Sequence, residues 1–151
     1  MRYIKKFNES VAKFSDDFIS TAKDICLELT DDDCEIVSFF RGYYLLGKTE
    51  QAYNRLTDSS KATGTNVTTE SFRICVNSKH CQWNKFNITI LESTLTRLEE
   101  LSSNFDFLVD VYIDYMDRYY EVVDIIDLYQ DKKKWDRLER MLGTEITIII
   151  Y

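Results

Sequence analysis

The sequence predicts an α+β protein, a single domain over residues 1–151 in which an antiparallel sheet is covered by helices on one face. Two segments, 11–29 and 88–101, repeat apolar residues every three or four positions, the spacing of the buried stripe of a helix. Other segments alternate β-branched or aromatic residues with polar ones, which is typical of strands. With 151 residues, 44% of them hydrophobic, the chain is long and apolar enough to bury a core of its own.

The first helix and the strand after it have clear boundaries. The apolar stripe of this helix comprises Val11, Phe14, Phe18, Ala22, Ile25 and Leu29. Ser15, followed by Asp16 and Asp17, is typical of an N-cap with acids in the first turn, so the helix proper begins near residue 15. Aspartates at 31–33 end it, and the Ile-, Val-, Phe- and Tyr-rich segment 34–46 is predicted to be a buried strand.

The segment 47–70 is predicted to be an irregular loop. Residues 49–56 fit a short helical turn, whereas residues 57–69 are almost wholly small and polar. Loops of this length inside a compact domain are usually functional or disordered, so this one is a candidate binding element. A short strand follows at 72–77, where apolar and polar residues alternate.

The next helix is expected over 88–101, with Asn84 as its N-cap and Ile88, Leu91, Leu95 and Leu98 on its stripe. A strand is then expected over 105–115, because every odd position is apolar or aromatic. The even positions of this segment include Asp106, Asp110 and Asp114. This period of two predicts a strand with one solvent-exposed, acidic face.

The last third of the chain is predicted to form a hairpin, a helix and a final strand. Residues 116–118 turn the chain, and the β-rich segment 119–125 is expected to pair back. The last helix carries Leu128, Trp135, Leu138 and Leu142 and ends at Gly143. The alternating Ile146, Ile148 and Ile150 predict the final strand.

The order of these elements suggests two copies of one helix–strand–strand unit. Leu-Glu-Leu-Thr-Asp at 27–31 and Leu-Glu-Glu-Leu-Ser at 98–102 each precede a predicted strand. Two such units favour a two-layer sandwich related to the ferredoxin-like topologies. The alternative is an all-helical bundle in which residues 104–142 form a continuous helix, and the alternation within 105–115 argues against it.

Composition narrows the classes of partner and compartment. A net charge of −7 and a pI near 4.8 argue against direct binding to nucleic acid or to an acidic membrane surface and favour a basic protein partner. No apolar run is long enough to span a membrane, and the N-terminal residues lack the pattern of a secretion signal, so a cytoplasmic location is expected. The four cysteines are therefore expected to be reduced thiols.

Two groups of residues suggest metal chemistry, and each has a simpler interpretation. Cys75, His80 and Cys81, with Cys34 or Cys26 as a fourth ligand, offer soft donors, but their spacing is not that of a standard zinc motif, which favours free thiols. The aspartates of 105–115, with Asp117 or Asp124, suggest a divalent-metal hydrolase. Residues four apart on a strand are about 13 Å apart, so a solvated face explains the aspartates better.

Catalytic and cofactor motifs are not found in the sequence. His80 is the only histidine and lies in no triad-like arrangement. The four glycines at 42, 47, 64 and 143 form neither a phosphate-binding loop nor a dinucleotide fingerprint. The basic cluster around 132–140 is interrupted by acids and fits a solvated helix face. We therefore expect no catalytic residue and no cofactor.

Three segments precede or end predicted elements. They are Met-Arg-Tyr-Ile-Lys-Lys-Phe-Asn-Glu-Ser at 1–10, Asp-Ile-Cys-Leu-Glu-Leu at 24–29 and Trp-Asn-Lys-Phe at 83–86. In these segments the chain resembles small uncharacterised proteins encoded by large tailed bacteriophages, over about half of its length. The resemblance implies a viral accessory protein in the host cytoplasm. It provides no catalytic residues to carry over.

These observations predict a non-enzymatic interaction protein that binds a host or viral protein through an acidic surface. The candidate partner-binding residues are Tyr43, Tyr44, Asp106, Asp110, Tyr112 and Asp114. One alternative is a homo-oligomer assembled through the C-terminal strand or the 104–125 hairpin, which would pair with a copy of itself. A further alternative is the divalent-metal-dependent hydrolase that uses the aspartates.

Overall fold

The computed structural model describes residues 13–31, 34–78, 85–131, 133 and 145–151. These form an α+β protein, as predicted, and the strands exclude the all-helical alternative. The elements in chain order are α1 (Asp16–Asp31), β1 (Cys34–Leu45), α2 (Glu50–Asn54), α3 (Asp58–Thr63), β2 (Thr68–Ser78), α4 (Lys85–Ser103), β3 (Val109–Ile113), the 3-10 turn η1 (Asp114–Met116), β4 (Arg118–Glu121), α5 (Val122–Gln130) and β5 (Ile146–Ile150).

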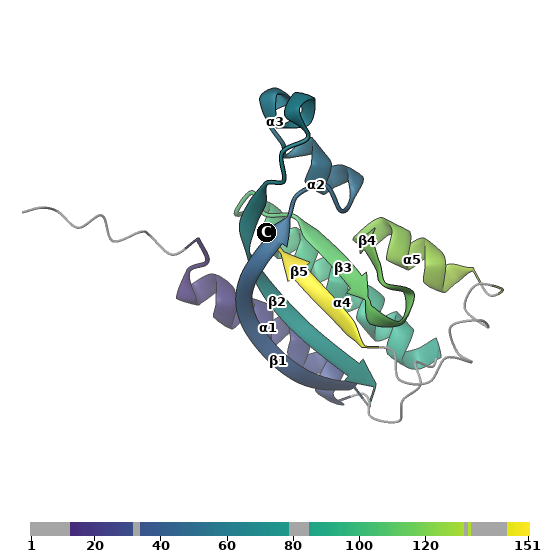
Figure 1. Ribbon diagram of the computed structural model, residues 1–151. Coiled ribbons are helices and arrows are strands. Elements are labelled where there is room, and N and C mark those ends of the chain that lie inside the picture. The colour runs from purple at the N-terminus through teal and green to yellow at the C-terminus, as the bar shows by residue number, and fades with distance from the viewer. Residues whose placement is uncertain (1–12, 32–33, 79–84, 132, 134–144) are drawn as a thin grey trace, which may run out of the picture.

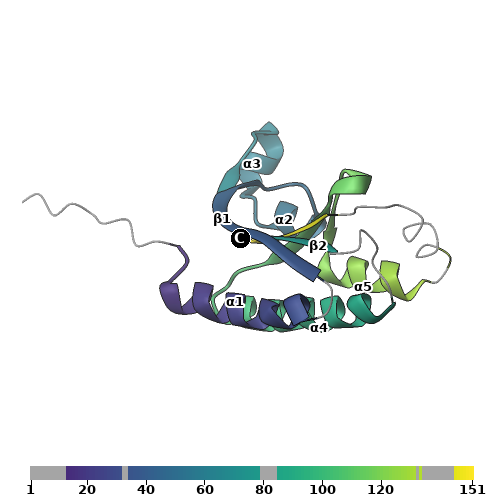
Figure 2. The same cartoon turned by 90° about the horizontal axis from the view of Figure 1, so that it is seen from below.

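The sheet has the order β1-β2-β5-β3-β4, and every neighbouring pair is antiparallel (Figure 1). Because β5 lies between β2 and β3, those two strands run parallel to each other and are connected through α4. Figure 2 shows α1, α4 and α5 below the sheet, whereas α2 and α3 lie above it on the connection from β1 to β2. The two-layer arrangement is thus confirmed for the three longer helices. The opposite face of the sheet is partly covered by the β1–β2 connection, which contains α2 and α3.

The two helix–strand–strand units are both present, as α1-β1-β2 and α4-β3-β4, but they are not copies of one arrangement. In the first unit the second strand, β2, pairs with β5, and β1 lies at an edge. In the second unit the first strand, β3, pairs with β5, and β4 lies at the other edge. The hypothesis of a structural repeat is therefore wrong.

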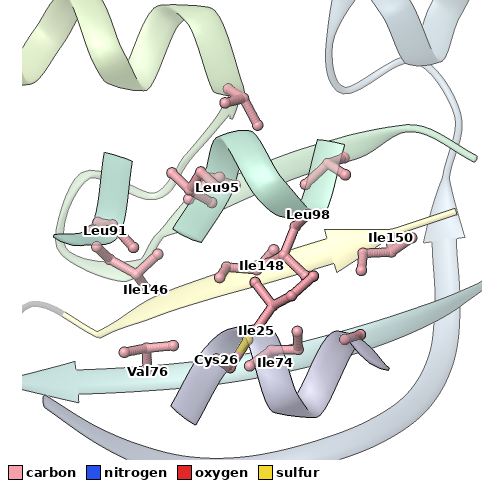
Figure 3. Packing of buried hydrophobic residues seen from close by; sticks show 14 of the residues in the cluster. Ile25, Cys26, Ile74, Val76, Leu91, Leu95, Leu98, Ile146, Ile148 and Ile150 are labelled. Carbon is pink, nitrogen blue, oxygen red and sulfur yellow. The ribbon is translucent and has the colours of Figure 1, made fainter. Parts of the chain in front are cut away.

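The main core lies between the sheet and the helices α1 and α4. Figure 3 shows Leu91, Leu95 and Leu98 of α4 over the isoleucines of β5, and Ile25 and Cys26 of α1 over β2. The predicted stripe is confirmed from Phe14 onward, since Phe14, Phe18, Ala22, Ile25 and Leu29 are all buried, whereas Val11 lies outside the described residues. Ser15 is confirmed as a cap, because its Oγ accepts a hydrogen bond from the backbone N–H of Phe18 at 3.2 Å.

Two boundaries differ from the sequence expectation in the segment 47–70. Residues 58–63 form the helix α3 rather than a loop, and β2 begins at Thr68. Thr49 and Thr57 supply the N-caps of α2 and α3, with side-chain oxygens that accept from backbone N–H groups three residues later. Gly64 ends α3 at φ +63°, a conformation that glycine adopts without strain.

Three further differences concern residues 105–142. The strand predicted over 105–115 is shorter, because Asp106 adopts φ +59° in the connection before β3 and Asp114 begins a 3-10 turn. The hairpin is confirmed through Glu121, but Val122–Gln130 form α5, since Val122 and Ile125 are also spaced as the buried stripe of a helix. Leu128 lies in α5, whereas Trp135, Leu138, Leu142 and Gly143 lie outside the described residues.

Candidate functional site

A buried carboxylate lies on the sheet face opposite the three long helices. The side chain of Asp110 is fully buried, and its two oxygens accept four hydrogen bonds from side chains. Oδ2 accepts from Tyr44 Oη at 2.6 Å, Thr49 Oγ1 at 2.8 Å and Tyr151 Oη at 2.9 Å, and Oδ1 accepts from Gln51 Nε2. We refer to these five residues as the Asp110 cluster.

The Asp110 cluster fastens the connection between β1 and β2 to the sheet. Thr49 uses one hydroxyl twice, as the N-cap that accepts from Ala52 N–H and as a donor to Asp110. Gln51 donates from its backbone N–H to Glu121 Oε1 at 2.8 Å and from Nε2 to the carbonyl of Val109 at 2.7 Å. Strand alternation aims Asp110 at this face, because Val109 and Val111 point to the helices.

The electrostatics of the Asp110 cluster suit a structural role, in which hydrogen bonds hold two segments together, rather than a reactive group. Burial raises the pKa of Asp110, and hydrogen bonds from four uncharged donors oppose that rise. Burial, with the neighbouring carboxylate, also raises the pKa of Tyr44 and Tyr151, so both phenols remain protonated donors. A fully buried carboxylate occupied by four donors offers no open position for a substrate.

The predicted partner-binding residues do not form one surface. Tyr44 and Asp110 are buried in the cluster, so the expectation that they contact a partner is wrong in this fold. Asp106 and Asp114 are exposed but lie outside β3, and so the expected acidic strand face does not exist. Tyr43 is 76% exposed on β1, and the half-buried Tyr112 donates from its hydroxyl to Asp117 Oδ1 at 2.7 Å.

The described residues proposed for metal binding do not form a metal site. Among the described residues, no group of three or more His, Cys, Asp or Glu side chains is placed to hold a metal ion. Cys75 lies on the sheet face opposite the three long helices, with Sγ 3.6 Å from Thr147 Oγ1. Cys26 is buried between the helices and the sheet, and burial raises the pKa of its thiol to about 12. His80 and Cys81 lie outside the described residues.

Negative charge is concentrated in one continuous part of the chain. The sequence analysis, which considered motifs one at a time, did not identify this concentration. Residues 105–131 contain eight acidic side chains and one arginine, a formal charge of −7 that equals the net charge of the whole protein. The remaining residues carry eighteen charges of each sign. A running charge count along the sequence would have found this segment.

Four exposed acids of this segment lie in α5 and in the turn between β3 and β4, whereas Asp106 lies before β3 and pairs with Arg55. We call Asp114, Asp117, Asp124 and Asp127 the acidic edge; all four are exposed. Beside them is a hollow of about 420 Å³, which is lined by Arg118, Tyr119, Tyr120, Asp124, Asp127 and Leu128, so that one cation accompanies its two carboxylates. Asp124 and Asp127 are three residues apart in α5 and so project from the same side of that helix.

Comparisons with known proteins return no match to a protein-family model, to a curated protein or to a solved structure. Within the part of the chain that the structure describes, none of the helices combines the length and the apolar character needed to cross a bilayer.

Proposed function

We propose that the protein is a non-enzymatic interaction protein that binds a basic segment of another protein at the acidic edge. The supporting observation is the charge of residues 105–131, which accounts for the entire net charge of −7. A field of this sign attracts a lysine- or arginine-rich partner and increases its rate of association. A bacteriophage setting and a location in the host cytoplasm rest on the sequence resemblance and stay predictions.

The side chains of the hollow suit a cationic ligand group. Asp124 and Asp127 outnumber Arg118 among the charged residues of the lining, and Tyr120, on the same sheet face as α5, supplies an aromatic ring against which an ammonium or guanidinium group can lie. The Tyr119 ring packs against Tyr44 and Tyr112 on the other face of the sheet, where Lys48 Nζ already lies 5.3 Å from its centroid. Val123, which is 55% exposed, adds apolar contact area.

The first expected result is salt-dependent binding of a labelled peptide of alternating lysine and serine, measured by fluorescence anisotropy at low ionic strength. The double variant Asp124→Asn/Asp127→Asn removes two exposed charges beside the hollow and is expected to raise Kd at least about fivefold, the effect of two surface ion pairs.

The matched control is Asp16→Asn/Asp24→Asn, which removes the same charge from exposed positions of α1. We expect less than about a twofold change in Kd, because neither Asp16 nor Asp24 lines the hollow and their charges act on the peptide only through water. Equal weakening by both double variants, or the absence of saturable binding, would contradict the proposed site.

Assembly with a second copy is the second candidate function, and the structure changes which strand would mediate it. β5 is paired on both sides, so the C-terminal strand offers no free edge to a copy. β4 lies in the acid-rich segment, where two copies would repel each other. β1, in contrast, is an edge strand whose exposed aromatic residues are Tyr43, at 76%, and Phe40, at 41%.

If β1 pairs with β1 of a second copy, light scattering after size exclusion at micromolar concentration is expected to give a dimer. Tyr43→Lys should then shift the protein to a monomer, because it places two like charges at the new interface. Tyr53→Lys, at a tyrosine that is 45% exposed on α2, should leave the dimer unchanged. A monomeric wild-type protein would remove this candidate.

A further inference from the structure

A separate hollow of about 380 Å³ lies where the start of the described chain meets the β1–β2 connection and the α4–β3 connection. It is lined by Lys13, Leu46, Arg55, Thr69, Phe105, Asp106, Phe107 and Tyr151. We call it the two-cation hollow, because Lys13 and Arg55 both reach it in a protein whose net charge is −7. Its volume lies within the range of small-molecule sites, roughly 300–1,000 Å³.

Lys13 is held in place against the hollow. Its Nζ donates to Thr69 Oγ1 at 2.8 Å and to the carbonyl of Glu70 at 3.1 Å. The same Nζ lies 5.7 Å from the ring centroids of Phe14 and Phe107. Burial lowers the pKa of Lys13; the Glu70 carboxylate opposes this shift, and the charge of Arg55 adds a smaller lowering, so the two cations are close enough to repel each other. A bound anion would relieve that repulsion.

Arg55 can exchange its present partner for a ligand. Its guanidinium donates to both carboxylate oxygens of Asp106, from Nη1 to Oδ2 at 3.3 Å and from Nη2 to Oδ1 at 3.2 Å, and Nη2 also donates to the Asp106 carbonyl at 3.0 Å. The Asp106 side chain is nevertheless 90% exposed. An ion pair so open to water contributes about 0–1 kcal/mol to stability. A ligand with two negative charges that also contacts Lys13 therefore competes well with the single carboxylate.

The apolar wall of the two-cation hollow is aromatic. Phe105 is 46% exposed although it is a large apolar residue, and its ring stacks on Phe107 at 6.0 Å and 15°. Phe18 supports both rings from α1, with centroids 5.2 Å from each. An exposed ring on a rigid aromatic base can stack against a planar ligand.

We propose that the two-cation hollow binds a small molecule in which a phosphate monoester is joined to a planar ring system, with Lys13 and Arg55 on the phosphate and Phe105 against the ring. Two cations match the phosphate monoester, which carries a charge of about −1.5 to −2 at neutral pH. This site differs from the acidic edge in both residues and sign of charge, so either proposal can fail without the other.

Isothermal titration with adenosine 5′-monophosphate at low ionic strength tests this proposal. We expect saturable binding to one site, which Lys13→Gln and Arg55→Gln each weaken at least about tenfold, the effect of losing one hydrogen bond to a charged group. Phe105→Ala should also weaken binding by about tenfold. Asp106→Asn should strengthen binding several-fold, because it removes the carboxylate that competes for Arg55.

The matched control is Lys23→Gln. Lys23 Nζ also lies over a phenylalanine ring, 5.1 Å from the centroid of Phe39, but it does not line the hollow. Its loss should leave the Kd for the nucleotide within about twofold, since it removes only long-range charge. No saturable binding at millimolar nucleotide, equal binding of adenosine, or equal weakening by Lys23→Gln would overturn the proposal. Thermal unfolding of each variant verifies that it is folded.

Discussion

Replacing Asp110 by alanine is expected to lower the free energy of unfolding by about 3–5 kcal/mol. The substitution leaves the hydroxyls of Tyr44, Thr49 and Tyr151 without their common acceptor and removes one of the two acceptors of Gln51 Nε2. An unsatisfied buried donor costs roughly 1–3 kcal/mol, and entry of water into the vacated space keeps the total below the simple sum. Urea unfolding followed by circular dichroism measures the change.

Asp114→Ala is the matched control, because Asp114 is exposed, and its effect should stay within about 0.5 kcal/mol. Equal losses at Asp110 and Asp114 would contradict a structural role for the cluster.

The pH dependence of stability gives an independent check on Asp110. Burial raises its pKa in the folded protein, so between the unfolded and folded values the folded state holds the additional proton. Raising the pH through that window therefore lowers the free energy of unfolding. The decrease should be present in the wild-type protein and absent from Asp110→Asn, in urea unfolding repeated across the acidic range. Parallel pH profiles for the two proteins would contradict the raised pKa.

Ile148→Ala is expected to lower the free energy of unfolding by about 3–4 kcal/mol, within the range for large-to-small changes in a core. Ile148 is fully buried in β5, where its backbone neighbours are Ile74 of β2 and Val111 of β3. The cavity would lie at the centre of the sheet, with paired strands on both sides that cannot move together to fill it. Chemical denaturation gives the difference from the wild-type protein.

Val123→Ala serves as the control for this substitution. Val123 is 55% exposed in α5, so its truncation should change stability by less than about 0.5 kcal/mol. A similar decrease in the free energy of unfolding for both variants would contradict the central position of Ile148 in the core.

The Asp110 cluster connects the two proposed binding regions. It holds α2 through Thr49 and Gln51, and the same short connection carries Lys48 to the Tyr119 ring and Arg55 to the two-cation hollow. Loss of the cluster is therefore expected to alter both regions at once, whereas the surface variants described above act on one region each.

Local patterns predicted the elements whose signals depend on near neighbours in the sequence. Ser15 and the stripe from Phe14 to Leu29 predicted α1, since helix periodicity and capping involve residues three or four apart. Alternation also predicted β5, but it did not predict that all five of its residues are buried. Burial on both faces results from pairing with β2 and β3, together with cover on each side, and those contacts are distant in sequence.

Asp110 shows the same limit at the candidate site. Alternation correctly placed it on the face opposite Val109 and Val111, and the expectation of a wet face followed from its charge. The period of a strand says which residues share a face, but not what covers that face. Here the cover is α2, held by Thr49 and Gln51 some sixty residues earlier in the chain.

The sequence by itself determined the α+β class, most of the helices and strands, and the acid-rich composition, because these depend on local spacing and on residue type. Only the tertiary structure decided the central position of β5, the burial of Asp110 and the meeting of Lys13 with Arg55 at one hollow. These features depend on which distant segments pack together, and that is set by burial of the whole apolar surface rather than by any one segment.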